Sequence, residues 1–190
     1  MLSSDLDSTF SQLEAHLLER GGLSASQTDP FFYFVFPPSQ ALEVRRRLVP
    51  WSARLRNAGL QVDRLSLSDL LWQLVDDAGT WDEWLAAEPA AEPRELNEAV
   101  SALLRTGGTL VEHVAAHLAS AGEGSVVFLT EIEMLHPYFR VRTLESALHD
   151  RVRVPTVVFY PGRRSGQFGL HFLDFYPEDG NYRATLLGGL

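Results

Sequence analysis

SVVFLTE at residues 125–131 and VPTVVFYPG at residues 154–162 decide the fold of this chain. Both are apolar runs rich in β-branched and aromatic residues, and each ends abruptly at polar or turn-forming residues, as buried strands do. The segment between them, HPYFRVRTLESALHD at 136–150, predicts a turn followed by one short amphipathic helix. A strand, a helix and a second strand in this order predict a parallel pair joined by a right-handed crossover.

The part of the chain before residue 125 continues this alternation of strands and helices. FFYFVF at 31–36 is an aromatic run that predicts a central, fully buried strand, and LQVDRL at 60–65 predicts a second strand. A helix is expected from Ser39 to Leu48, and Pro50 is expected to start a further helical turn. The remaining helices are predicted at residues 5–20, 68–77, 95–105 and 109–121.

Three further segments complete the prediction of the fold. Residues 79–93, GTWDEWLAAEPAAEP, are expected to form an irregular surface excursion because of their prolines and alanines. Residues 169–174 predict a fifth strand, and residues 182–187 predict a short edge strand. We therefore expect a single three-layer α/β domain over residues 1–190, with a mostly parallel central sheet of about five strands.

The composition limits the class of protein. The chain has 190 residues, of which 45% are hydrophobic and 22% charged. This length and apolar content are enough for one domain with a hydrophobic core. No apolar run approaches the roughly 20 residues that span a bilayer, and the amino terminus lacks the basic start and apolar core of a signal peptide. The absence of cysteine excludes disulfides and thiolate metal sites. A bacterial, cytoplasmic protein without membrane contact is expected.

The charge of the chain argues against binding to nucleic acid. The formal net charge is −9, whereas proteins that bind phosphate backbones present a basic surface. All 16 basic residues are arginine. Direct nucleic-acid binding by the isolated chain is therefore not expected.

The alternation of strands and helices resembles the core of a P-loop NTPase, but the nucleotide chemistry is missing. A P-loop needs GxxxxGKS/T after the first strand, because bare amides wrap the phosphates and a lysine reaches their oxygens. Here the first strand is followed by Pro37-Pro38-Ser39-Gln40, which has no lysine and lacks two of the amide donors. We expect a degenerate P-loop-type core without nucleotide motifs, no ATP hydrolysis, no catalytic residue and no cofactor.

Two functional hypotheses remain open at this point. Parallel sheets form their sites where strands end, here at Thr130–Glu133 and Tyr160–Gly162. A nucleotide- or metal-binding regulatory enzyme would use this carboxyl edge. Its candidate residues are Glu131, Glu133, His136 and Arg140, which could hold a divalent metal through oxygen ligands.

The favoured hypothesis is an interaction module, because no catalytic constellation is found. Aromatic residues and arginine are enriched at the anchors of protein interfaces. The candidate partner-binding residues are Trp81, Trp84, Leu85, Tyr138, Phe139 and Arg140. The same tryptophans could instead close the edge of the core.

The final third of the chain resembles the BrxB family of BREX (bacteriophage exclusion) antiphage defence systems. The resemblance is carried by FLTEIEMLHPYFRVRTLESAL, VPTVVFYPGRRSGQFGLHF and NYRATLL, and LSLSDLL at 65–71 adds to it. It implies a non-catalytic component of a defence complex whose partner is the alkaline-phosphatase-like protein PglZ or another BREX component. The residues that match the family pattern are Pro137, Arg140, Pro155, Tyr160, Pro161, Gly162, Gly166, Asn181, Tyr182 and Arg183.

Overall fold

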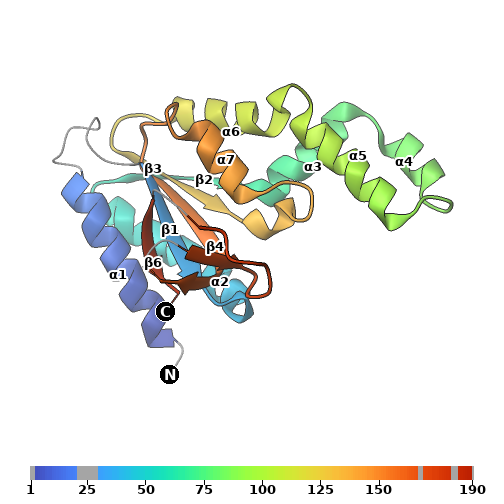
Figure 1. Cartoon of the computed structure of the whole chain (residues 1–190). Coiled ribbons are helices and arrows are strands. Elements are labelled where there is room, and N and C mark those ends of the chain that lie inside the picture. The colour runs from blue at the N-terminus through green and yellow to red at the C-terminus, as the bar shows by residue number, and fades with distance from the viewer. Residues whose placement is uncertain (1–2, 21–29, 167–168, 181–183, 190) are drawn as a thin grey trace.

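A mostly parallel sheet of six strands forms the centre of the computed structural model, which describes residues 3–20, 30–166, 169–180 and 184–189 (Figure 1). The strand order is β2-β3-β4-β1-β6, and every neighbouring pair in this order is parallel. The strands are β1 (Phe31–Phe36), β2 (Gln61–Ser66), β3 (Ser125–Thr130), β4 (Thr156–Ser165), β5 (Gly169–Phe172) and β6 (Thr185–Gly188). The predicted α/β class and parallel sheet are confirmed; the likeness to a P-loop core is not.

Helices cover both faces of this sheet. One face carries α1 (Ser3–Arg20) and α2 (Ala41–Asn57), and the other carries α3 (Leu67–Ala78), α6 (Thr109–Ser120) and α7 (Val141–Leu148) (Figure 1). Two further helices, α4 (Trp81–Ala87) and α5 (Pro93–Arg105), extend beyond the sheet at the end of α3. Short 3-10 turns complete the chain: η1 (Pro38–Gln40), η2 (Thr106–Gly108) and η3 (Ile132–Leu135).

The side chains of β1 explain the three layers. All six of its residues are buried, because this strand lies between β4 and β6 and is covered on both faces. Phe31, Tyr33 and Val35 pack against the α3–α6–α7 side, while the alternate residues belong to the cluster with α1 and α2. Burying each large apolar side chain contributes about 1.5–3 kcal/mol to the free energy of unfolding. Strand β1 therefore stabilises the packing on both faces of the sheet.

The structure corrects two local predictions in the helical part of the chain. Residues 79–93 are not irregular throughout, because α4 occupies Trp81–Ala87 and α5 begins at Pro93. The helix after β1 does not restart at Pro50, which lies within the continuous α2. Pro50 is on the exposed side of α2, where the carbonyl that loses its amide partner can be hydrated.

The carboxyl-terminal strands differ most from expectation. Tyr160-Pro161-Gly162 was expected to end a strand, but β4 continues to Ser165 and forms an antiparallel hairpin with β5. Strand β5 ends at Phe172, because Leu173 and Asp174 adopt left-handed backbone conformations. The predicted edge strand is β6, which pairs with β1 from Thr185 onward. In the part of the chain that the structure describes, no helix is long and apolar enough to span a bilayer.

Candidate functional site

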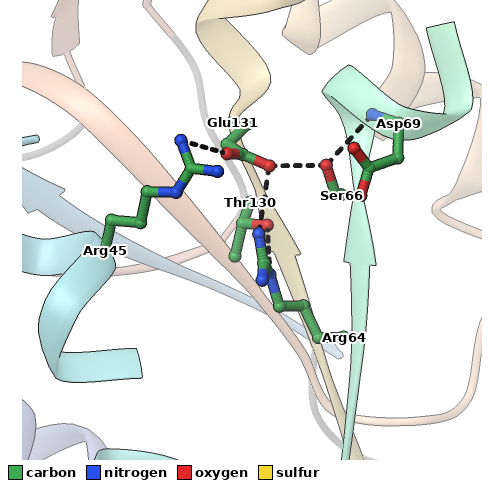
Figure 2. A network of polar contacts seen from close by, with 6 residues as sticks. All are labelled: Arg45, Arg64, Ser66, Asp69, Thr130 and Glu131. Atoms are coloured by element: carbon green, nitrogen blue, oxygen red, sulfur yellow. Dashed lines mark hydrogen bonds and ion pairs between the residues drawn. The ribbon is translucent and has the colours of Figure 1, made fainter. Parts of the chain in front are cut away.

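The carboxyl edge of the sheet holds a compact network of charges around Glu131. This residue follows β3 directly and has a left-handed backbone with φ of 59°. Its Oε1 lies 3.2 Å from an Nη1 of Arg45, on α2, and its Oε2 lies 3.0 Å from Nη2 of Arg64, on β2. Figure 2 shows the two guanidinium groups approaching the carboxylate from different elements.

Ser66 joins this network to the start of α3. Its hydroxyl donates to Oε2 of Glu131 at 2.5 Å and accepts the amide of Asp69 at 3.1 Å, so it is the N-cap of the helix (Figure 2). Arg64 also donates from Nε to the hydroxyl of Thr130 at 2.9 Å. Both carboxylate oxygens of Glu131 are therefore engaged by groups of the chain itself, and the network ties the ends of β2 and β3 together.

The four residues of the enzyme hypothesis do not form one cluster. Glu131 and Glu133 line a small cavity of about 90 Å³ beside α2, whereas His136 and Arg140 line a different one. Burial raises the pKa of Glu133, and the negative charge of Glu131 adds to this. Among the residues that the structure describes, no group of three or more histidine and carboxylate side chains is placed to hold a metal ion.

The second cavity, of about 300 Å³, lies between the segment 136–142 and the end of the β4–β5 hairpin. His136 and Tyr176 share a hydrogen bond across it, and Arg142 donates to Asp179 at 2.5 Å. Burial lowers the pKa of His136, and the nearby charge of Arg140 acts in the same direction. These contacts hold the hairpin against the helix layer.

Most residues of the family pattern lie in or next to β4 or line the second cavity. Tyr160 is 1% exposed and its ring lies 5.6 Å from that of Tyr33 and 5.3 Å from that of Phe172. Pro155 precedes β4, Pro161 and Gly162 lie within it, Pro137 and Arg140 line the second cavity, and Gly166 follows β4 with φ of 61°. Asn181, Tyr182 and Arg183 lie outside the residues that the structure describes.

An apolar groove of about 280 Å³ lies among α3, α4, α5 and η3, and we call it the tryptophan groove. Trp72 stacks on Trp81 with ring centroids 5.7 Å apart, and Trp81 meets Trp84 edge-on at 6.3 Å. Its lining residues are Leu71, Trp72, Val75, Trp81, Trp84, Leu85, Glu88, Leu96, Val100, Met134 and Tyr138.

Large apolar side chains of the groove are exposed to solvent. Trp72 is 47% exposed, Trp81 36% and Leu85 58%. The indole nitrogen of Trp81 donates to Oδ1 of Asp76 at 2.6 Å, which fixes the ring in this partly exposed position. Apolar side chains clustered in this way mark interaction surfaces more often than scattered ones do.

The structure brings four of the six predicted contact residues into this groove: Trp81, Trp84, Leu85 and Tyr138. Phe139 is only 7% exposed, packs in the core and lines the second cavity, as Arg140 does. Sequence reasoning missed Trp72 as a candidate contact residue. The apolar face of its helix is formed by Leu70, Leu71, Leu74 and Val75, and Trp72 lies off that face. A tryptophan off that face is a signal that could have been used.

The fold and these features define a three-layer α/β protein of the parallel-sheet class, with an arginine-bound carboxylate at the sheet edge and an exposed tryptophan groove. The family model described as "BREX protein BrxB" matches residues 63–187, about two thirds of the chain. The chain belongs to the BrxB family and is thus a component of BREX antiphage defence. No curated protein and no solved structure matches it.

Proposed function

We propose that this protein is a non-catalytic adaptor of the bacterial cytoplasm that binds another BREX component through the tryptophan groove. The family resemblance favours PglZ as the partner. The observation that carries the proposal is the exposure of Trp72 and Trp81 as a stacked pair in a single groove. Rigid aromatic anchors are the residues that most often dominate binding energy at interfaces.

The carboxyl edge of the sheet supports the non-catalytic part of the proposal. Arg45 and Arg64 neutralise Glu131, and Pro37-Pro38 occupies the position at which a phosphate loop would begin. The charged residues among them stabilise the junction of α2, β2 and β3. This structural role explains why charged side chains lie there, so no bound substrate is needed to explain them. We expect no phosphate release from ATP above that of a Glu131→Ala/Glu133→Ala control in a steady-state assay.

Co-purification tests the adaptor role. The tagged full-length chain is isolated from cells that carry its complete BREX gene neighbourhood, at low and at high salt, as wild type and as Trp84→Ala. Val49→Ala is the matched control, because Val49 is 76% exposed but lies on α2, away from the groove. We expect PglZ to co-purify with wild type and Val49→Ala and to be depleted with Trp84→Ala.

Each other outcome has a definite meaning. Capture of a different BREX component would refute PglZ as the partner and leave the adaptor role in place. Absence of every BREX component under all conditions would refute the adaptor role. Equal capture by wild type and Trp84→Ala would remove the tryptophan groove from the interface.

A further inference from the structure

We infer that the tryptophan groove selects a protein segment whose apolar anchors are flanked by arginine or lysine. This inference rests on the proposed function and adds the chemistry of the partner to it. The groove supplies the apolar contact, and the charge distribution around it supplies the selectivity.

The acidic charge of the chain is concentrated in the elements that build the groove. Residues 72–98 contain eight aspartates and glutamates and one arginine, whereas the whole chain has a net charge of −9. All eight carboxylate residues are exposed. Eight carboxylates and one arginine give this segment a net charge of −7, so the elements around the groove hold most of the net negative charge of the protein, although they hold only eight of its 25 acidic residues.

Several of these carboxylates are available to a partner. Glu98 pairs with Arg94, and Asp76 accepts the indole nitrogen of Trp81. Within the described part of the chain, Asp77, Glu83 and Glu88 form no ion pair or side-chain hydrogen bond, and Glu88 itself lines the groove. Carboxylates beside an apolar pocket attract a segment that carries positive charge next to its anchor residues.

The same charge disfavours the other occupants. A two-fold symmetric contact between two copies would place the acidic residues of one groove against those of the other, and like charges in contact oppose association. An anionic membrane surface or a nucleic acid would be repelled for the same reason. The groove volume of about 280 Å³ is at the lower end of ligand pockets, so it suits a few anchor side chains of a short segment.

A peptide scan tests the inference directly. Short overlapping peptides that cover the other BREX proteins of the same gene neighbourhood are probed with the full-length chain, and the strongest binders are titrated by following intrinsic tryptophan fluorescence. The variants are Trp84→Ala, Glu83→Gln/Glu88→Gln, and the control Glu123→Gln/Asp150→Asn. Glu123 precedes β3 and Asp150 follows α7, so the control removes the same charge without altering the lining of the groove.

We expect the bound peptides to share large apolar residues flanked by arginine or lysine. Trp84→Ala should weaken binding about tenfold, the effect of losing roughly 1.4 kcal/mol at an interface anchor. Glu83→Gln/Glu88→Gln should weaken it about threefold or more at low salt and much less at high salt, because salt screens the attraction. The control should change affinity by less than about twofold, since its charges lie away from the groove.

Three results would overturn the inference. The first is a set of binders that is neutral or acidic, and the second is an equal effect of the control and the Glu83→Gln/Glu88→Gln variant. The third is a scan without binders while the intact complex still co-purifies, which would leave the adaptor role standing and place the contact elsewhere. Loss of both the peptides and the intact complex would instead refute the proposed function.

Discussion

Gly162, a residue of the family pattern, is expected to be required for the full stability of the fold for a steric reason. It lies on β4 opposite Phe172 of β5, where the strand leaves the parallel sheet and enters the hairpin. A Cβ at this position would lie 2.2 Å from the backbone oxygen of His171 and 2.9 Å from Cε1 of Tyr160. The φ of Gly162 is not positive, so contact alone, and not backbone conformation, requires glycine.

The size of the effect follows from which atoms collide. Overpacking a core costs about 1–3 kcal/mol, and a clash with the backbone of a paired strand belongs at the upper end, because no side-chain rotation relieves it. For a chain of this length 1 kcal/mol lowers Tm by about 2–4 °C, so Gly162→Ala should melt about 6–12 °C lower than wild type. Thermal unfolding followed by circular dichroism measures this directly.

Gly122→Ala is the matched control for this experiment. Gly122 lies in the turn before β3, has no positive φ, and a Cβ there would meet no atom within 4 Å. Its substitution should change the free energy of unfolding by no more than about 0.5 kcal/mol. A Gly162→Ala protein that melts with the Gly122→Ala control would refute the steric argument and reopen a binding role for this glycine.

Three further substitutions test other contacts. Tyr33→Phe removes a buried 2.7 Å hydrogen bond to Glu145 and should lower the free energy of unfolding by about 1–3 kcal/mol in denaturant titrations; an unchanged midpoint would contradict this. Ser66→Ala removes the N-cap of α3 and its bond to Glu131, and should cost about 1–2 kcal/mol, whereas Ser66→Thr should recover part of it. Glu133→Gln should raise Tm at neutral pH, because burial raises the pKa of Glu133 and ionisation then destabilises the folded state; the gain should vanish below the ordinary pKa of 4.5. A gain of equal size at acidic pH would show that charge is not its cause.

The sequence predicts the central layers well because their signals are local. FFYFVF, SVVFLTE and the apolar run of β4 lack alternation, and only a strand buried on both faces tolerates that pattern. By contrast, the hairpin of β4 and β5 was missed because Pro161 and Gly162 are ordinary turn residues. Pro161 lies beyond Val158, the last residue of β4 that pairs with β3. On the side that faces β3, no ladder hydrogen bond needs the amide that proline lacks, so the strand can continue through Pro161.

The candidate site is less predictable because it depends on contacts between distant elements. The tryptophans of α4 were identified by residue type, but Trp72 belongs to α3 and Met134 to η3, and only the packing of these elements brings them together. The pairing of Glu131 with Arg45 and Arg64 likewise joins residues that are far apart in sequence. The types of single residues were enough to suggest an interface. The shape of that interface could be described only once the packing of the helices was known.

The position of α4 and α5 has a consequence for local opening of the native state. Among the described residues α4 has none that is buried and α5 has only Leu104, and both helices extend beyond the sheet (Figure 1). Their amide hydrogens should therefore exchange with solvent through openings that require much less free energy than global unfolding, while the amides of β1 and β4 exchange last. One wall of the tryptophan groove thus belongs to the part of the molecule that opens first, and an occupant would register as slowed exchange confined to these two helices.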